Sequence, residues 1–338
     1  MLKNHFGDFN LSFQHIKIAG IGSYLPDRIV SNDDLSEKLD TSDEWIFSHT
    51  GIRQRRIADD SQSPVDMALA ASQKALADAG ISASELGMVI LSTCTGDYNY
   101  LPSSACLLQH RLGAENAAAF DLLAACTGFV YALEMGRCWA VCNQKPVLIV
   151  ASEMLSRITD WESRETCILF GDGAAALVLL PSEKNGILHS YLGADGNNSH
   201  LLAVAGGSRL PRSREPVLPS YVQMQGRATF SIAVRALEQV VLKILQDKGL
   251  QMEDIAHIVP HQANMRILET LAKRLNIPIE RLHANIDRVA NTSSASIPIL
   301  LDELKEQGKL KPNDLILTVA FGGGLTYGGN LIRWQPEA

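Results

Sequence analysis

The chain has 338 residues, enough for two domains or one large domain with a sizeable buried core. Hydrophobic residues make up 46% of it and charged residues 20%, as in an ordinary globular protein. The formal net charge of −7 argues against a general nucleic-acid-binding protein, and no apolar run approaches the roughly 18 residues that a membrane span requires. Any basic docking surface would therefore be local.

The cysteines and the first residues of the chain indicate the cellular compartment. None of the six cysteines forms a C-x-x-C pair, and this spacing favours reduced thiols over disulfides or a zinc site. Residues 1–17 are mixed polar and aromatic and lack the apolar segment of a signal peptide. We therefore expect a cytoplasmic protein with no metal site.

The first elements along the chain predict the fold class. Residues 16–22 read as a strand, residues 64–79 as an alanine-rich helix that ends at Gly80, and residues 86–93 as a buried strand. Alternation of strands and helices favours an α/β fold in which helices cover the faces of sheets.

Residues 118–133 predict an apolar strand, a tight turn of small residues and a helix with almost no polar face, which belongs in the interior. Cys126 stands where this helix begins. Because unpaired N–H groups and the helix dipole favour negative charge there, we expect the pKa of its thiol to be lowered. Ala124, Ala125 and Gly128 leave room for a ligand to reach the sulfur. The alternative is a buried cysteine that only packs as a small hydrophobic residue.

The two halves of the chain resemble each other. The segment that follows Gly80 matches the one that follows Gly249, at a separation of 169 residues. Further along, in the same order, the turn that holds Cys126 matches the turn that holds Asn291. Each match is weak alone, but their shared order indicates an internal duplication.

We therefore predict two helix–strand halves, residues 1–185 and 186–338, related by a pseudo-twofold axis. In such an α/β body the strand ends and their turns converge near the axis, where ligands bind. The turns that carry Cys126, His261 and Asn291 would then share one neighbourhood. Taken singly, the histidine and the asparagine could each be an ordinary hydrogen-bonded turn residue.

Several motifs in collinear order carry a resemblance to a known family. They are residues 41–46 (TSDEWI), 50–53 (TGIR), 125–129 (ACTGF), 170–173 (FGDG), 260–267 (PHQANMRI), 291–293 (NTS) and 321–326 (FGGGLT). From about residue 16 to residue 334 the chain resembles β-ketoacyl-acyl-carrier-protein synthase III. The resemblance implies an α/β thiolase-like fold, a five-layered αβαβα body with two pseudo-duplicated halves, and a homodimer.

The resemblance also implies catalytic roles. Cys126 matches the nucleophile that takes the acyl group from acyl-CoA, a task that suits sulfur because exchange between thioesters is nearly balanced in energy. Gly323 matches the position whose backbone N–H, with that of Cys126, would hold the developing oxyanion. His261 and Asn291 match the pair that donates hydrogen bonds to the malonyl thioester carbonyl while CO₂ leaves.

Substrate contacts follow from the same resemblance. Trp45 and Arg164 match positions that flank the CoA adenine. His49 stands where the family usually has a CoA-contacting arginine, a departure that puts CoA as the donor in question. Leu101 matches an often aromatic position that bounds the acyl pocket across the dimer, so the starter could be larger or branched.

A carrier-protein surface is expected on the helix after His261. Its basic residues fall on one face of that helix and its apolar residues mainly on the other, which suits docking of an acidic carrier protein. The residues assigned to this surface are Gln262, Arg266, Lys273 and Arg274. A merely solvated helix face is the alternative.

The implied reaction is the decarboxylative Claisen condensation of an acyl-CoA starter with malonyl-acyl carrier protein, which initiates fatty acid biosynthesis through an acyl-Cys126 intermediate. No cofactor is expected, and acyl carrier protein, acyl-CoA and a second copy of the chain are the expected partners. A secondary-metabolism relative with another acceptor is the first alternative. A Cys–His–Asn hydrolase is less favoured because the gap between His261 and Asn291 is only 30 residues and a C-G-S-C-W signature is missing. The presence of all three residues argues against a non-catalytic binding module.

Overall fold

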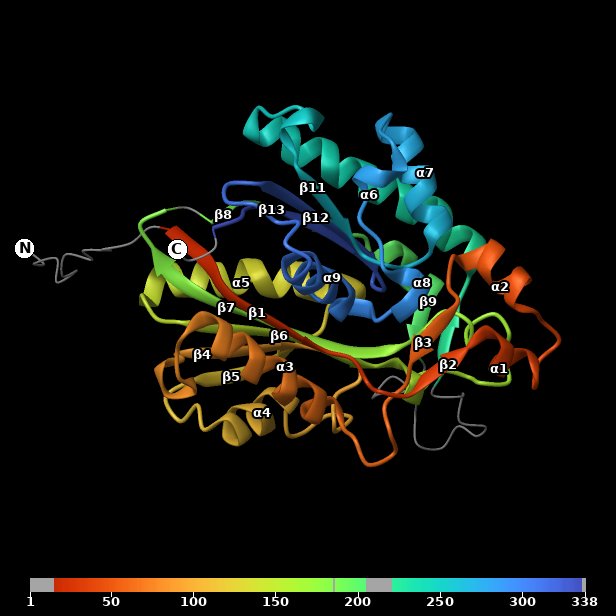
Figure 1. Ribbon diagram of the computed structural model, residues 1–338, viewed down its shortest axis with the longest axis horizontal. Helices are drawn as coiled ribbons and strands as arrows, with labels where there is room; N and C mark the ends of the chain where they lie inside the picture. The colour runs from red at the N-terminus through yellow and green to blue at the C-terminus, as the bar shows by residue number, and fades with distance from the viewer. Residues whose placement is uncertain (1–14, 185, 205–220, 336–338) are drawn as a thin grey trace, which may run out of the picture.

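The computed structural model describes residues 15–184, 186–204 and 221–335, and these form five layers of alternating helices and sheets (Figure 1). From one outer face to the other, the layers are helices, a five-stranded sheet, helices, a four-stranded sheet and helices. The α/β class and the five-layered arrangement predicted from the sequence are therefore confirmed.

The first sheet has the strand order β1-β7-β6-β4-β5. Its parallel strands β4 and β6 are buried along their whole length, since helices cover both faces. Strand β7 is antiparallel to both of its neighbours. The strands are β1 (His15–Tyr24), β4 (Met88–Ser92), β5 (Ala118–Leu122), β6 (Val147–Met154) and β7 (Asp172–Ser182).

The second sheet has the order β11-β12-β13-β8, with β11 parallel to β12 and the other pairs antiparallel. Its strands are β8 (Ile187–Ala194), β11 (His257–Pro260), β12 (Leu315–Gly322) and β13 (Thr326–Arg333). The first sheet thus uses residues up to 182, and the second uses residues from 187 onward.

Three pairs of helices complete the layers. α5 and α9 lie between the sheets and share one apolar core with both of them, as expected for the apolar segment after Cys126. α3 and α4 cover the outer face of the first sheet, and α6 and α7 cover that of the second. The helices are α3 (Pro64–Ala79), α4 (Ser104–Leu112), α5 (Gly128–Asn143), α6 (Gly226–Lys248), α7 (Met265–Leu275) and α9 (Ser296–Glu306).

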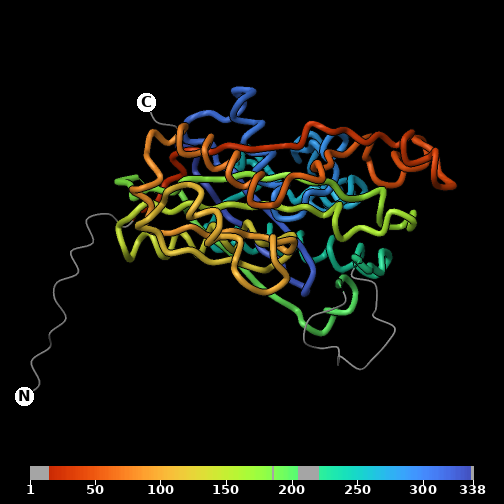
Figure 2. The backbone as a smooth tube through the Cα atoms, turned by 90° about the horizontal axis from the view of Figure 1, so that it is seen from below, coloured from red at the N-terminus to blue at the C-terminus, as the bar shows by residue number. Residues whose placement is uncertain are grey.

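Short elements gather at one end of the molecule. Both views place α1 and α2 there (Figures 1 and 2), and the small sheets β2–β3 and β9–β10 lie near them in Figure 1. The elements are α1 (Asn32–Ser36), α2 (Asp43–Thr50), α8 (Ile286–Val289), β2 (Ile29–Ser31), β3 (Gln54–Arg56), β9 (Leu202–Val204) and β10 (Val222–Met224). The 3₁₀ turns are η1 (Ala83–Glu85), η2 (Ala125–Thr127), η3 (Leu155–Ile158), η4 (Gly196–Leu201), η6 (Met252–Asp254), η7 (Ile279–Arg281) and η8 (Ser293–Ala295).

The duplication extends to individual backbone conformations. α3 and α6 each end at a left-handed glycine, Gly80 and Gly249, and each continues through a 3₁₀ turn into a parallel strand. η2 and η8 each begin with a non-glycine residue at positive φ, Ala125 at 46° and Ser293 at 50°, and each leads directly into a central helix. Such a conformation costs about 1 kcal/mol or more and persists only where packing enforces it.

The alanine-rich face of α3 explains how closely this helix packs on β1. A Cβ atom added to Gly20 in β1 would lie 2.3 Å from the carbonyl oxygen of Ala75 and 2.5 Å from the backbone nitrogen of Ala79. Because both are backbone atoms of a buried helix, neither can turn away. Only glycine fits at this crossing.

Gly20→Ala is therefore expected to lower the free energy of unfolding by about 1–3 kcal/mol through overpacking. Urea unfolding followed by circular dichroism measures this loss. Gly196→Ala is the control, because no heavy atom of the described residues lies within 4 Å of the added Cβ. Its expected change is within about 0.5 kcal/mol, and equal stability of the two variants would contradict the packing argument.

Candidate active site

The turns that carry Cys126, His261 and Asn291 open onto one cavity of about 860 Å³. Cys126 comes from η2 at the start of α5, His261 follows β11, and Asn291 lies between α8 and η8. The two halves therefore contribute different residues to one site. Bringing these three side chains to a single cavity is what the sequence analysis predicted.

Small residues let the two halves approach at Cys126. A Cβ atom added to Gly322, at the end of β12, would lie 2.7 Å from the Cys126 backbone nitrogen. Gly128 is confined within the first half, where an added Cβ would lie 1.9 Å from Ser92 Oγ, and it also faces the Ser294 Cβ of the second half at 3.4 Å. Side chains at these glycines would push the loops apart. Gly323, the residue assigned to the oxyanion site, is the next residue along, and a Cβ added there would lie 3.6 Å from the Ala125 Cβ.

The electrostatics at Cys126 contradict the expectation of an acidic thiol. The pKa of the Cys126 thiol is raised to about 12, chiefly by burial; a hydrogen bond with Ser293 lowers it and the nearby Glu153 carboxylate raises it. The field at a helix N-terminus is worth only about 0.3–1 kcal/mol, less than the cost of taking a thiolate out of water. Cys126 therefore rests as a neutral thiol.

His261 is buried and has its ring fixed by a serine. Its Nδ1 lies 2.7 Å from Ser296 Oγ, and the same hydroxyl oxygen accepts a hydrogen bond from the Gln262 backbone N–H at 3.3 Å. The serine proton is then free to go to Nδ1, so the imidazole carries its own proton on Nε2. Burial lowers the pKa of His261 to about 3, opposed by a hydrogen bond to the Ser293 backbone. The ring is neutral at physiological pH and acts as a donor.

Asn291 is oriented by the turn that follows it. Its Oδ1 accepts a hydrogen bond from the Ser293 N–H at 2.8 Å, and the residue is only 7% exposed. With the carbonyl side of the amide engaged, the NH₂ group remains to donate to a molecule in the cavity. Sequence reasoning named Asn291 but missed Ser293 and Ser296, since local pattern does not reveal which hydroxyl supports which side chain.

The predicted adenine-flanking residues touch each other. The Arg164 guanidinium lies 4.6 Å from the centroid of the Trp45 ring and donates to the Asp40 carbonyl at 2.7 Å. The His49 ring stacks on Trp45 with 4.2 Å between centroids and 22° between planes. Trp45 and Arg164 would have to separate to admit a base between them. The stacking of His49 follows from its position four residues along α2, a spacing that places side chains together.

The predicted carrier-protein residues do not form one set. Arg266 and Lys273 are exposed, and Arg266 also lines the cavity. Arg274 is exposed too, but its guanidinium is paired with Glu238 at 2.6 Å. Gln262 is fully buried and its amide donates to the backbone of Pro260, so its assignment to a docking surface was wrong. The reason is its position directly after a buried strand end, where the amide satisfies backbone groups.

Leu101 does not line the cavity of its own chain and is 83% exposed. Tyr98, Tyr100 and Leu123 are exposed as well, and β5, the strand that precedes Leu123, is an edge strand of the first sheet. These residues form an apolar area outside the site, here named the β5 edge patch.

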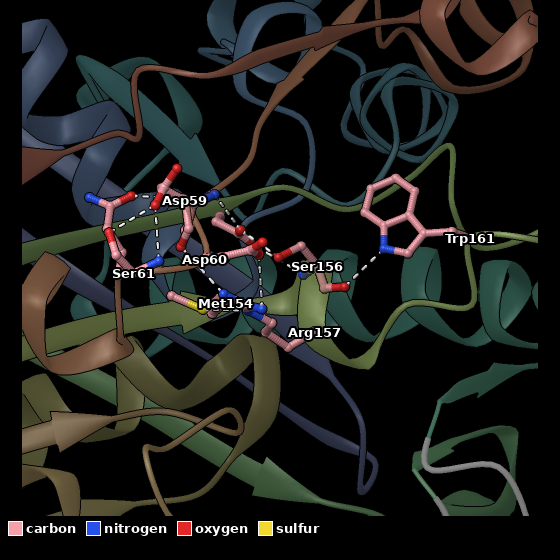
Figure 3. Close-up of polar contacts among 10 residues, drawn as sticks. Asp59, Asp60, Ser61, Met154, Ser156, Arg157 and Trp161 are labelled. Carbon is pink, nitrogen blue, oxygen red and sulfur yellow. Dashed lines mark hydrogen bonds and ion pairs between the residues drawn. The ribbon is translucent and has the colours of Figure 1, made fainter.

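A polar network supports the wall of the cavity between β6 and β7. Ser156 and Ala58 donate to the buried carboxylate of Asp172, from the FGDG motif, at distances of 2.6–2.9 Å. Burial raises the pKa of Asp172. Figure 3 shows Arg157 reaching the loop of Asp59 and Asp60, and the Trp161 indole N–H donating to the Ser156 carbonyl at 3.0 Å. The segment so held carries Arg164 and the cavity residues Ile168, Leu169 and Phe170.

Within residues 15–184, 186–204 and 221–335, no group of three or more His, Cys, Asp or Glu side chains could hold a metal ion. Among the helices in that part of the chain, none is long and apolar enough to cross a membrane.

Comparisons with known proteins agree on one family. Two family models match, 3-oxoacyl-[acyl-carrier-protein (ACP)] synthase III over residues 120–196 and its C-terminal counterpart over residues 245–334. Beta-ketoacyl-[acyl-carrier-protein] synthase III of Caldanaerobacter subterraneus subsp. tengcongensis is 46% identical over 94% of this chain and 97% of its own. The protein of that name from Xanthomonas campestris pv. campestris is 46% identical over 94% and 98%.

Solved structures give the same result. The crystal structure of 3-oxoacyl-[acyl-carrier-protein] synthase III from Aquifex aeolicus is similar with a TM-score of 0.88 and 43% identity, over 94% of this chain and 100% of that one. The priming β-ketosynthase of the R1128 polyketide biosynthetic pathway is similar with a TM-score of 0.91 and 34% identity, over 96% and 97%.

The neutral resting thiol makes a prediction about alkylation. Because the pKa of Cys126 is about 12, its reaction rate with iodoacetamide should rise about tenfold per pH unit from pH 7 to pH 10. Peptide mass spectrometry at each pH measures the rate, with the exposed Cys106 of the same molecule as the internal reference. A plateau for Cys126 below pH 9 would show that the thiol is acidic after all.

Proposed function

The chain belongs to the β-ketoacyl-acyl-carrier-protein synthase III family and is a condensing acyltransferase of fatty acid biosynthesis; on that premise we propose how its own residues carry out the reaction. The substrates are an acyl-CoA starter and malonyl-acyl carrier protein, and the product is β-ketoacyl-acyl carrier protein. One observation carries the proposal: Cys126, His261 and Asn291 line a single cavity.

The first step is transfer of the acyl group to Cys126. The Cys126 sulfur attacks the thioester carbonyl, the bond from that carbon to the CoA sulfur breaks, and the thiol proton ends on the released CoA. Because the resting thiol is neutral, its proton leaves as the carbon–sulfur bond forms. The backbone N–H groups of Cys126 and Gly323 would hold the oxyanion, and loss of one such donor typically costs about 3 kcal/mol.

The second step is decarboxylation of the malonyl group. His261 Nε2–H and the Asn291 NH₂ group donate to the thioester oxygen, whose negative charge grows as the bond to CO₂ breaks. The enolate carbon then attacks the acyl carbonyl on Cys126, the bond from that carbon to the Cys126 sulfur breaks, and the sulfur takes up a proton from water. Both donors are neutral, so they stabilise the enolate by hydrogen bonds without transferring a proton to it. No step requires a cofactor or a metal.

Substrate binding uses the rim of the cavity. Trp45 and Arg164 would separate and hold the adenine of CoA between them. Arg266 and Lys273 would contact an acidic carrier protein. The charge of Arg274 is already paired with Glu238, so this side chain would contribute less to binding. Binding through exposed charges weakens as salt rises.

A second candidate keeps the same three residues but uses another acceptor or donor. His49 favours it, because a stacked imidazole replaces the permanent charge of the family's arginine near CoA. The similarity to a polyketide-priming β-ketosynthase also supports it.

We place the protein in the cytoplasm as a homodimer. Exposed apolar residues in the β5 edge patch would be costly to leave in water, and the free edge of β5 offers unpaired backbone groups. A second copy that covers this patch would bring its Leu101 to the acyl end of the neighbouring site.

The nucleophile is tested by intact-mass spectrometry after mixing with acyl-CoAs of different chain lengths. The wild type should gain one acyl mass and lose it when malonyl-carrier protein is added, with release of CO₂. Cys126→Ala should gain none, because no other thiol is proposed to accept the acyl group. Cys142→Ala, at an exposed cysteine, is the control that should behave as the wild type. Acylation of Cys126→Ala would refute the assignment, and normal acylation without CO₂ release in the wild type would favour the second candidate.

The variant His261→Ala tests whether His261 serves decarboxylation rather than acylation. Acylation of Cys126 should remain largely intact while decarboxylation falls by about 10²–10³, because one of two enolate donors is lost. Since the pKa of His261 is about 3, protonation of this ring should not reduce decarboxylation between pH 5 and pH 8 in the wild type. The half-exposed His189, changed to alanine, is the control. An equal loss of both steps in His261→Ala would argue that the histidine serves acylation as well.

A further inference from the structure

A fully buried carboxylate lies behind the active site and has no role in the mechanism above. Glu153 is near the end of β6 and has no exposed surface. Its Oε2 accepts hydrogen bonds from the Cys94 backbone N–H at 3.0 Å, from the Cys94 thiol at 3.2 Å and from the Thr95 hydroxyl at 3.1 Å. These donors fix it to the segment that follows β4 in the same sheet.

The other oxygen reaches into the second half of the chain. Glu153 Oε1 accepts a hydrogen bond from Ser294 Oγ at 2.7 Å, and Ser294 lies in η8. The residue before it, Ser293, holds Asn291 through its N–H, and Ser296, two residues later, holds His261. One turn thus orients both donors of the decarboxylation step, and Glu153 is bonded to the middle of it.

This turn requires a stabilising contact because its backbone is strained. Ser293 has a φ of 50°, a left-handed value that a serine adopts only when its surroundings impose it. On the nucleophile side, Ala125 has the equivalent conformation, and the residue after it, Cys126, is packed against Gly322. On the donor side, the short bond from Ser294 to Glu153 holds the turn against the first sheet.

We propose that Glu153 is a positioning residue: through Ser294 it clamps the turn that aims Asn291 and His261 at the malonyl thioester carbonyl. This inference deepens the proposed function and rests on it. Glu153 touches no reacting atom in this scheme. It lets the first half of the chain, which carries the nucleophile, set the geometry of the donors that the second half supplies.

The same position gives an independent readout at the nucleophile. Cys94 and Glu153 both interact electrostatically with Cys126, and the Glu153 carboxylate raises the pKa of the Cys126 thiol. Removing the negative charge without changing the shape of the side chain should therefore make Cys126 easier to ionise. A residue that contributed only to the packing of β6 would not have this effect.

The experiment compares Ser294→Ala, Glu153→Ala and Glu153→Gln with Ser152→Ala. Ser152 is the residue before Glu153 in β6, is fully buried, and donates to the Pro64 carbonyl at 2.7 Å on the side of the sheet away from the turn. Ser152→Ala thus removes a buried serine hydrogen bond but leaves the hydrogen bond between Ser294 and Glu153 in place. Thermal unfolding of each variant identifies those that fold, and single-turnover acylation and CO₂ release are measured on them.

We expect Ser294→Ala and Glu153→Ala to slow CO₂ release by about a hundredfold, the usual consequence of a donor displaced by about 1 Å. Ser294→Ala leaves the Glu153 charge in place, so its acylation rate and its KM for malonyl-carrier protein should change little. Glu153→Gln, which keeps an acceptor oxygen, should recover most of the rate and move the alkylation profile of Cys126 about one pH unit lower. If Ser294→Ala releases CO₂ as fast as Ser152→Ala, the inference is overturned.

Failure of the proposed function has a different signature. In that case the wild type itself acylates but releases no CO₂. The dependence of Cys126 alkylation on pH then tests whether Glu153 acts on Cys126. A shift of the Cys126 alkylation profile in Glu153→Gln would support the position of Glu153 beside the nucleophile. An unchanged profile would overturn the inference.

Discussion

Close approach of two backbone turns across the middle of the molecule is the constraint on which the site depends. The turn of Cys126 belongs to the first half, and Gly322, at the end of β12, packs on its backbone with no room for a side chain. On the other side of this contact, a Cβ atom added to Gly128 of the first half would lie 3.4 Å from the Ser294 Cβ of the second. Each of the three active residues is held by a turn at an element end, so the cavity exists only while these turns stay together. Small residues at the contact are therefore a condition of the chemistry as well as of packing.

The burial that brings the turns together also sets the protonation states. Removal from water raises the pKa of Cys126 and lowers that of His261, so the pair rests as neutral thiol and neutral imidazole rather than as an ion pair. A neutral imidazole is the better partner for an enolate, because it donates a hydrogen bond without giving up its proton. Buried serine hydroxyls and one buried carboxylate satisfy the polar groups that this arrangement takes out of water.

Duplication followed by divergence explains how one backbone form serves two tasks. Ala125 and Ser293 share the same left-handed conformation at the start of equivalent turns. In the first half that turn presents a nucleophile, and in the second half it orients hydrogen-bond donors through its N–H and hydroxyl groups. The fold thus contains the same strained turn twice, at Ala125 and at Ser293, and the side chains of each turn determine its function.

The sequence alone predicted the main elements, the duplication and three residues that line one cavity. The helix of residues 64–79 and its glycine cap follow from local pattern, and Cys126, His261 and Asn291 stand at strand or helix ends that an α/β body brings together. Tertiary structure decided which way burial moves the thiol pKa, and that Gln262 points inward. It also decided the partners of Glu153 in the other half of the chain. These depend on distances between residues far apart in sequence and on exclusion of water, which no local pattern encodes.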